Sequence, residues 1–378
     1  MKIICKQEKL IKALNIVSKA VSTTSPLEIT KGILIKTEGD MLISLSATDI
    51  QISITTKMDA IVNEKGGIVV SARIFTDLVR KLPPGNILIA TDEKGIVNIN
   101  TDNSDYDLQG KEEEEFPRID SDEEGKQIRL NKEDIKDLID GTAFAASMDE
   151  SRGVITGVLF EIKEGTLSLV ALDGYRVAIK RERNEILFKG EDIKAIVPAK
   201  HMREISKILS DTAGDEQVLL DIGERRIKLY TEDTLVRVNL LEGEYIKYKD
   251  VLPKDSRVTI VTGRVELLGA VERAAMLKSD GKEGKNAFVR FSVSDEAVTV
   301  SSRAAEGKGL ETIKADKNGE DIEIGFDAKF MTDALKAIPD DEIEMQFNTS
   351  VSPCLIKPVD SDRFEYLILP VRLSTVSV

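Results

Sequence analysis

The sequence predicts an α+β protein made of three tandem copies of one domain. A short amphipathic segment occurs three times, and Ala72, Ala199 and Ala328 mark the same point in each copy, 127 and 129 residues apart. A repeat of this length in a chain of 378 residues leaves room for three units, each long enough to bury its own core. Every unit also combines helical periodicity with alternating apolar and polar runs, which indicate half-buried strands.

Polar stretches that contain glycine or proline separate the three units, at residues 120–126 and 248–257. The sequence therefore predicts domains at residues 1–120, 127–248 and 254–378. Each domain is expected to hold two helices that pack side by side on one layer of sheet. The six expected helices are Glu8–Val21, Ser71–Leu82, Lys132–Ser147, Pro198–Ser210, Arg264–Ser279 and Asp327–Ile338.

The composition is that of an ordinary globular protein, with 41% hydrophobic and 32% charged residues. No apolar run approaches the roughly 20 residues that cross a bilayer. The N-terminal residues lack the long apolar core of a signal peptide. Cys5 and Cys354 are the only cysteines. We therefore expect a cytoplasmic protein without a disulfide.

The net charge is −14, which taken alone argues against nucleic-acid binding, yet the six predicted helices are together net positive. In the helix Ser71–Leu82, Ile74, Leu78 and Leu82 are expected to face the sheet, while the basic residues point outward. Such a surface would contact DNA phosphates without reading bases. An ordinary solvated helix face has the same pattern, and the helices at Lys132 and Asp327 lack it. The outward basic residues predicted from helical geometry are Lys12, Arg73, Arg80, Lys200, Arg203 and Lys207.

Residue patterns of enzyme chemistry are missing from the sequence. His201 is the only histidine, is expected at the surface of a helix, and has no cysteine or second histidine nearby. No phosphate-binding glycine loop is present. Asp49 and Asp173 occupy equivalent strand ends, where a role in a turn fits better than the alternative of a metal-dependent nuclease. We predict no cofactor and no metal; a protein scaffold that forms no ring is a third possibility.

Three motifs carry a resemblance to a known family. They are Ala171-Leu-Asp-Gly-Tyr-Arg-Val-Ala178, Asp250-Val-Leu-Pro253 and Tyr366-Leu-Ile-Leu-Pro-Val-Arg-Leu373. Together with the threefold repeat, they make the chain similar over its whole length to the bacterial DNA polymerase III beta sliding clamp family. The resemblance implies a non-catalytic homodimer of DNA clamp folds, closed head to tail into a ring with helices inside and sheets outside. Such a ring encircles duplex DNA and makes a polymerase processive.

The resemblance also implies partners that bind through a short peptide with a glutamine and hydrophobic anchors. These partners are the replicative DNA polymerase, a clamp loader and other replication and repair proteins with a clamp-binding motif. The peptide lies in a groove between the second and third domains. The matching positions are Ile155, Leu172, Gly174, Tyr175, Arg176, Val177, Ile246, Val251, Val351, Leu367, Leu369, Pro370, Val371, Arg372 and Leu373.

For the dimer interface, the resemblance points to Tyr106 and Leu108 on the first domain against Met276 and Leu277 on the third. For DNA, it supports Arg73 and adds Arg152. The family usually ends near the motif at Arg372, whereas this chain continues through Ser374–Val378. The sequence leaves open whether these last residues cover part of the groove.

Overall fold

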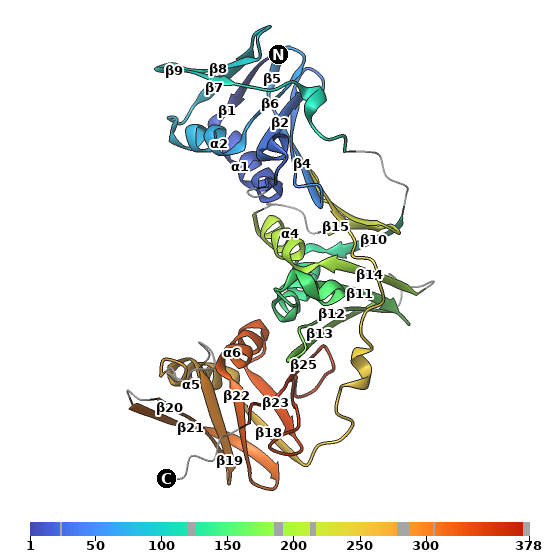
Figure 1. Cartoon of the computed structure of the whole chain (residues 1–378), viewed down its shortest axis with the longest axis vertical. Helices are drawn as coiled ribbons and strands as arrows, with labels where there is room; N and C mark the ends of the chain where they lie inside the picture. The colour runs from blue at the N-terminus through green and yellow to red at the C-terminus, as the bar shows by residue number, and fades with distance from the viewer. Residues whose placement is uncertain are drawn as a thin grey trace. The chain divides into compact units, whose positions relative to one another are not determined.

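The computed structural model describes residues 1–22, 25–119, 125–184, 192–211, 217–277, 287–304 and 307–372. The chain forms two compact units, one of Met1–Glu133 with Glu204–Leu240 and the other of Asp134–Arg203 with Leu241–Val378. Figure 1 follows the elements along the chain. The units do not coincide with the three sequence repeats, because strands of the second repeat pair with strands of both other repeats.

The first unit contains two antiparallel sheets, ordered β5-β1-β7-β8-β9 and β10-β15-β16-β17-β4-β3-β2-β6. Its strands are β1 (Lys2–Lys6), β2 (Gly32–Thr37), β3 (Leu42–Thr48), β4 (Ile52–Asp59), β5 (Ile61–Glu64), β6 (Gly67–Ser71), β7 (Asn86–Thr91), β8 (Ile96–Thr101), β9 (Ser104–Gln109), β10 (Lys126–Asn131), β15 (Gln217–Ile222), β16 (Arg226–Tyr230) and β17 (Thr234–Asn239). Its helices are α1 (Gln7–Val17) and α2 (Ala72–Lys81), with short 3-10 turns η1 (Ser18–Ala20), η2 (Glu28–Lys31) and η3 (Glu113–Glu115).

The second unit is built on one sheet, ordered β14-β11-β12-β13-β25-β24-β23-β18-β21-β20-β19-β22. Its strands are β11 (Gly157–Lys163), β12 (Thr166–Leu172), β13 (Arg176–Arg183), β14 (Ile193–Pro198), β18 (Val258–Gly263), β19 (Phe288–Ser294), β20 (Ala297–Ala304), β21 (Gly307–Gly319), β22 (Ile322–Asp327), β23 (Glu342–Phe347), β24 (Cys354–Lys357) and β25 (Phe364–Ile368). Its helices are α5 (Arg264–Ala274) and α6 (Ala328–Ala337), with 3-10 turns η4 (Ala143–Ala145), η5 (Glu150–Thr156) and η6 (Tyr248–Asp250). The helices α3 (Lys132–Asp140) and α4 (Ala199–Asp211) cross from one unit to the other along the chain.

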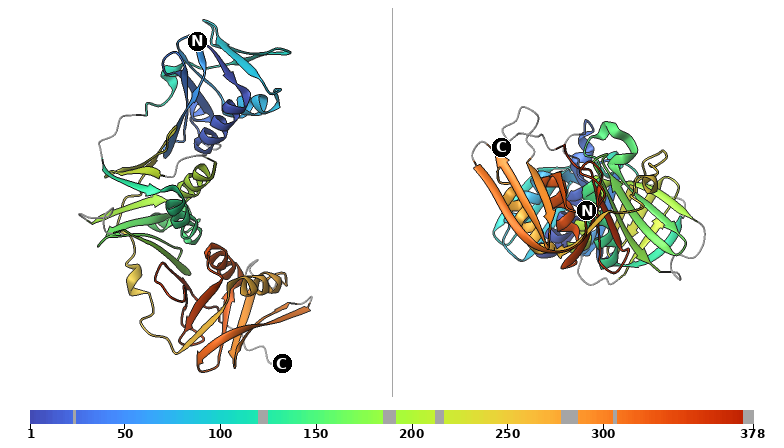
Figure 2. Two further views of the ribbon diagram at one scale, coloured as in Figure 1. Left: turned by 180° about the vertical axis from the view of Figure 1, so that it is seen from behind. Right: turned by 90° about the horizontal axis from the view of Figure 1, so that it is seen from below.

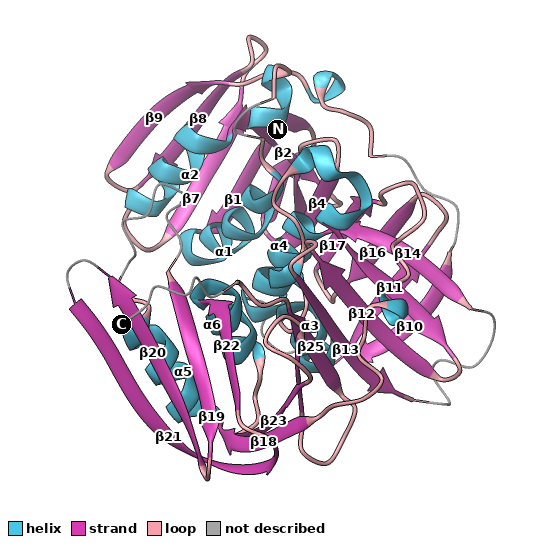
Figure 3. Ribbon diagram, turned by 60° about the horizontal axis from the view of Figure 1, so that its bottom comes forward, coloured by secondary structure: helices cyan, strands magenta, loops and turns pink. Residues whose placement is uncertain are grey.

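The helices pack in pairs, as expected for an α+β repeat. In the first unit α1 contacts α2, β3 and β4, and in the second unit α5 contacts α6, β20 and β21. Both pairs lie side by side in Figure 1 and again, from another direction, in Figure 3. Seen from behind in Figure 2, each pair still lies against the strands of its own unit. No helix among the described residues is long and apolar enough to span a bilayer.

The expected inner face of α2 is corrected by the structure. Ile74, predicted to face the sheet, is 55% exposed, whereas Phe75 and Val79 are fully buried. The buried positions follow the spacing i, i+3, i+4 and i+7 from Ala72. The apolar face is therefore turned by one residue from the predicted one, because Phe75 fills the core more completely than Ile74 could.

Two further expectations about helices are wrong. The third helix ends at Asp140 and not at Ser147, because Gly141 follows and a 3-10 turn at Ala143–Ala145 continues the chain. His201 is 3% exposed on α4 and not a surface residue. Its place on the helix, two residues after Ala199, falls on the buried side once the true face is known.

Main-chain hydrogen bonds join the repeats edge to edge within each unit. In the first unit β4 pairs with β17, and the amide of Asn239 donates to the carbonyl of Gln51 over 2.9 Å. In the second unit β13 pairs with β25, and the amide of Leu369 donates to the carbonyl of Tyr175 over 2.8 Å. The two junctions thus share one hydrogen-bond pattern, at equivalent positions of successive repeats.

One of these junction turns holds a strained residue. Ile50, between β3 and β4, has φ +80°, which β-branched residues rarely adopt. Oδ1 of Asp49 accepts the amides of the two residues after Ile50, and Nδ2 of Asn239 donates to the Ile50 carbonyl over 3.1 Å. The equivalent residue between β12 and β13 is Gly174, with φ +92°. The surrounding hydrogen bonds therefore hold Ile50 in a conformation that suits glycine.

We expect Ile50→Gly to raise the free energy of unfolding by about 1 kcal/mol, because glycine removes the left-handed strain. Little burial is lost, since the Ile50 side chain is 51% exposed. The measurement is the urea midpoint of the full chain, followed by circular dichroism. The matched control is Ile61→Gly on β5, where the residue is 53% exposed without a positive φ, and this variant should be destabilised. An unchanged or lower midpoint for Ile50→Gly would contradict the strain.

Candidate functional site

The turn between β12 and β13 places neighbouring side chains of the predicted groove in opposite environments. Oδ1 of Asp173 accepts the amides of Tyr175 and Arg176 over 2.9 and 3.1 Å. Gly174 supplies the positive φ, and Nη1 of Arg152 donates to the Asp173 carbonyl over 2.5 Å. As a result, Tyr175 is 59% exposed while Arg176 is 7% exposed.

Arg176 is held on all sides by the second and third repeats. Its Nε donates to Oδ2 of Asp173 over 3.0 Å, and its Nη1 donates to Oδ2 of Asp333 on α6 over 2.7 Å. Its Nη2 donates to the carbonyl of Phe144 over 2.8 Å, and its guanidinium carbon lies 4.6 Å from the ring centroid of Phe330. A buried guanidinium is tolerated only with such partners. Arg176 therefore ties α6 of the third repeat to the turn of the second.

Arg203, predicted to contact DNA, lies beside this cluster. Its side chain is half-buried, and its Nη2 donates to the carbonyl of Ala143 over 2.7 Å. Burial and the nearby charge of Arg176 lower the pKa of Arg203, while Asp333 acts in the opposite direction. The positive charges of Arg176 and Arg203 are thus matched by the negative charges of two carboxylates, Asp173 and Asp333.

Four predicted groove residues belong to the protein core. Ile155, Leu172, Val177 and Leu367 are each at most 7% exposed. They form one buried cluster, completed by Leu159, Val170, Ile179, Ile196, Tyr248 and Leu355. A peptide on the surface could reach these residues only through gaps between their neighbours, so we assign them the floor beneath the site.

The linker between the second and third repeats is fastened to the sheet by a buried carboxylate. The hydroxyl of Tyr248, in η6, donates to Oε2 of Glu161 on β11 over 2.9 Å, and Lys194 Nζ lies 3.2 Å from Oε1 of Glu161. Ile246 and Val251 flank this anchored turn and are 46% and 49% exposed. The anchor explains why two apolar side chains of a linker stay at the surface.

Two main-chain hydrogen bonds hold the C-terminal segment in place. The amide of Leu369 donates to the carbonyl of Tyr175, and the amide of Val371 donates to the carbonyl of Gly325 on β22 over 2.9 Å. Leu369 is 37% exposed. Pro370 and Val371 are half-buried, Arg372 is exposed, and Leu373 lies outside the described residues.

Five of the predicted groove residues are exposed apolar side chains, namely Tyr175, Ile246, Val251, Val351 and Leu369. All five belong to the second unit. Tyr175 and Leu369 are neighbours through their main chains, and Ile246 and Val251 flank Tyr248, which packs in the same buried cluster as Val177 and Leu367. Exposed apolar side chains above a buried floor, with few polar groups, suit an anchored peptide.

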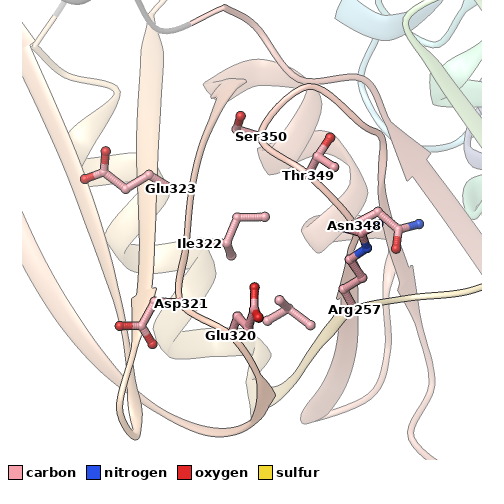
Figure 4. Close-up of a pocket in the computed structure, with 9 residues that line it drawn as sticks. Arg257, Glu320, Asp321, Ile322, Glu323, Asn348, Thr349 and Ser350 are labelled. Atoms are coloured by element: carbon pink, nitrogen blue, oxygen red, sulfur yellow. The ribbon is translucent and has the colours of Figure 1, made fainter.

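A separate polar pocket of about 380 Å³ opens elsewhere in the third repeat (Figure 4). Residues 320–323, which run from the turn after β21 into the start of β22, form one side. Residues 348–350 after β23 form another, with Arg257 and Val258 at the start of β18. None of the predicted groove residues lines it. The pocket therefore shares no residue with the predicted groove, although Val351 of the groove directly follows Ser350 in the chain.

Most of the basic residues predicted to contact DNA are exposed. On α1 and α2, Lys12, Arg73 and Arg80 all face solvent, and Nη2 of Arg80 donates to Asn15 on α1 over 2.6 Å. On α4, Lys200 and Lys207 are exposed as well. Arg152, in η5, is exposed, but its guanidinium holds the carbonyl of Asp173, as described above.

The residues expected at the dimer interface lie on an edge strand of the first unit and in the turn after α5 of the second. β9, which carries Tyr106 and Leu108, is an edge strand of the five-stranded sheet. Tyr106 is 46% exposed, and Met276, just after α5, is 76% exposed. Leu108 and Leu277 are half-buried. An open strand edge with an exposed aromatic side chain is the kind of surface that proteins cover by association.

Comparison with known proteins identifies the family. Models of the N-terminal, central and C-terminal domains of the DNA polymerase III beta subunit match residues 1–120, 129–247 and 249–372. The chain belongs to the DNA polymerase III beta subunit family. This family is the beta sliding clamp, a non-catalytic processivity factor of the polymerase.

Individual clamps are similar over their whole length. The beta sliding clamp of Bacillus subtilis is 31% identical over 383 residues, which cover 98% of this chain and all of the relative. A crystal structure of a putative DNA polymerase III beta subunit from Eubacterium rectale has a TM-score of 0.91 at 35% identity, with 99% of this chain and 100% of that chain covered. The sliding clamp structure from Bacillus subtilis has a TM-score of 0.92 at 30% identity and covers 99% of both chains.

Membership of the beta clamp family removes the support for a nuclease. Asp49 and Asp173 each accept main-chain amides in a turn, as the sequence analysis favoured. Within the described ranges, no group of three or more His, Cys, Asp or Glu side chains is arranged to hold a metal ion. The two aspartates therefore close equivalent turns of successive clamp repeats.

Sequence reasoning missed the residues that hold the candidate site in place. Phe144, Phe330 and Asp333 surround Arg176, while Glu161 and Tyr248 anchor the linker. A signal for two of them was present, because Phe330 and Asp333 lie three residues apart in the third copy of the repeated helix and so share one face. Nothing in the sequence alone paired Glu161 with Tyr248, which are far apart along the chain.

We expect the Glu161 anchor to weaken in acid. Burial raises the pKa of Glu161, but hydrogen bonds from Tyr248 and Lys194 outweigh burial and hold the pKa below its ordinary value of 4.5. A carboxylate with a lowered pKa stabilises the folded state above the ordinary value, and this contribution is lost as the pH falls through the folded pKa. Glu161→Gln should therefore be less stable than the wild type at pH 7, with the difference shrinking below about pH 4.5.

The measurement is the urea midpoint of both proteins between pH 7 and pH 3. The matched control is Glu93→Gln, in an exposed turn, which should keep the pH dependence of the wild type. A difference between wild type and Glu161→Gln that stays constant over this range would contradict the assignment.

Proposed function

We propose that this protein is a homodimeric sliding clamp that closes into a ring around duplex DNA and tethers the replicative polymerase. The observation that carries the proposal is the match of three consecutive clamp domains along residues 1–372. Three repeats per chain give six per dimer, and a head-to-tail contact that closes by rotation makes a ring. The proposal keeps the domain boundaries predicted from the sequence, at 1–120, 127–248 and 254–378.

DNA contact in this proposal rests on exposed basic side chains of the helices. Lys12, Arg73, Arg80, Lys200 and Lys207 are exposed in a protein whose net charge is −14. They would neutralise phosphates without reading sequence, which gives weak, salt-sensitive binding that permits sliding. Arg152 and Arg203, which hold main-chain carbonyls, would contribute to the shape of the site as well as to its charge.

Tethering in this proposal uses the exposed apolar residues of the second unit, which would take a linear peptide with a glutamine and hydrophobic anchors. The replicative polymerase, a clamp loader and further replication and repair proteins would share this groove. A clamp works on chromosomal DNA, so the proposal also places the protein in the cytoplasm. It needs no cofactor.

The ring is tested by retention on DNA of different topology. The protein, loaded on a nicked circular plasmid by a clamp loader and ATP, should stay with the plasmid through gel filtration in 0.3 M salt. It should be lost when the plasmid is cut once before filtration, because a ring slides off free ends. Equal retention on circular and linear DNA would overturn the proposal.

The matched control for that experiment is Leu108→Asp. The change puts a charge on the edge strand β9 at the proposed dimer seam. This variant should elute as a monomer and should not stay on the circular plasmid. If Leu108→Asp still formed a stable dimer, the dimer interface would not lie on β9.

The groove is tested by Leu369→Ala, which removes an exposed anchor without removing the main-chain hydrogen bond to Tyr175. Peptide affinity should fall about tenfold, since losing a well-packed apolar contact costs roughly 1.4 kcal/mol or more. The measurement is fluorescence anisotropy of a labelled peptide with one glutamine and two leucine anchors. Leu310→Ala on β21, a leucine that is 70% exposed, is the control and should bind as the wild type does. If Leu369→Ala and Leu310→Ala bound the peptide with equal affinity, the groove would not lie at Leu369.

A further inference from the structure

One face of α6 touches two consecutive residues of the groove turn. Phe330 and Asp333 lie three residues apart on this helix and so share a face. Asp333 accepts a hydrogen bond from Nη1 of Arg176 over 2.7 Å. The ring of Phe330 stacks on the ring of Tyr175, with centroids 6.0 Å apart and planes 22° apart. The helix of the third repeat thus holds both Tyr175 and Arg176 of the second.

The first repeat provides an internal comparison for this contact. The residue equivalent to Arg176 is Ile52, which is 1% exposed and follows a turn with the same hydrogen bonds. The turn therefore forms without an arginine. A buried arginine with two carboxylates is seldom more stable than an apolar side chain of similar size. A role in binding at the surface thus explains the charge cluster at the second junction better than the stability of the turn does.

The surface above the cluster is the side chain of Tyr175. It is 59% exposed, and a free tyrosine ring of this exposure would sample several rotamers. Stacking on Phe330 favours one orientation, and aromatic pairs of this kind contribute about 0.5–1.5 kcal/mol beyond burial. A wall that is already in place costs a ligand less ordering entropy when it binds.

We propose that Phe330 and Asp333 are positioning residues for peptide binding, which hold the ring of Tyr175 as a preformed wall of the groove. Asp333 fixes Arg176, which fixes the main chain of the turn, and Phe330 fixes the ring of Tyr175. The inference rests on the proposed function, because it gives α6 a role in that same groove.

The test uses the full-length protein and a fluorescein-labelled peptide with one glutamine and two leucine anchors. Phe330→Leu should weaken binding about fivefold, because the residue keeps its apolar volume but loses the stacking. Phe330→Tyr keeps the ring and should restore the affinity of the wild type. Asp333→Asn should weaken binding about tenfold, because Arg176 then loses a charged partner. Binding is measured at 15 °C, after thermal scans show every variant folded.

A double-mutant cycle separates positioning from a merely structural role. In a Tyr175→Ala background, Phe330→Leu should weaken binding less than it does in the wild type, because the ring that it positions is gone and only its contact with Arg176 remains to be lost. A purely structural Phe330 would change affinity equally in both backgrounds, or would lower the melting temperature with unchanged affinity. Either result would overturn the inference.

The matched control is Asp77→Asn, since Asp77 holds the same position in α2 that Asp333 holds in α6. Asp77 is exposed, and its variant should bind the peptide as the wild type does. Wild-type protein that fails to bind the peptide would overturn the proposed groove and the inference together. Wild-type protein that binds, with Phe330→Leu and Asp333→Asn binding equally well, would overturn the inference alone.

Discussion

The antiparallel pairing of β13 with β25 is the interaction on which the candidate site depends. It joins the second repeat to the end of the third, so that Tyr175 and Leu369 share a main-chain hydrogen bond although they are far apart in the sequence. Strand edges favour such pairing because their unpaired amides and carbonyls can form hydrogen bonds with another strand. Since β4 and β17 pair in the same way in the first unit, the second and third repeats each add their last strand to the preceding repeat. The proposed peptide groove is therefore a product of a junction and not of any single domain.

The two junctions share a backbone but differ in what they bury. At the first, Ile52 fills the position with an apolar side chain, and Ile50 tolerates a strained φ in the turn. At the second, Gly174 relaxes the turn, and Arg176 brings a charge that needs Asp173, Asp333 and the Phe144 carbonyl. Internal repeats make such differences informative, because the first junction shows what the fold alone requires. The second junction adds Arg176 and its charged partners to what the fold requires, and we expect binding at that place.

The helix α2 has a buried apolar face that stabilises the fold and an exposed face that carries positive charge. Phe75 and Val79 hold α2 to the core, while Arg73 and Arg80 stay in solvent. In a protein of net charge −14, a few exposed cations on helices give local attraction to phosphate while the acidic remainder repels stray nucleic acid. This arrangement suits a protein that must stay on DNA without gripping it, since retention by topology requires no tight contact.

The sequence by itself determined the threefold repeat, the α+β class, the family and the turn role of Asp49 and Asp173. The repeat, the class and the turns follow from periodicity and from side chains that act on their own neighbouring backbone, both of which are local properties. The family follows from the resemblance that the motifs at Ala171–Ala178, Asp250–Pro253 and Tyr366–Leu373 carry. Only the tertiary structure decided that Ile74 and not Phe75 is exposed, that His201 is buried, and that Leu172 and Val177 lie in the core while Tyr175 reaches the surface. The partners of Arg176 and Glu161 were also beyond the sequence, because strand pairing and helix packing bring together residues whose separation along the chain carries no signal.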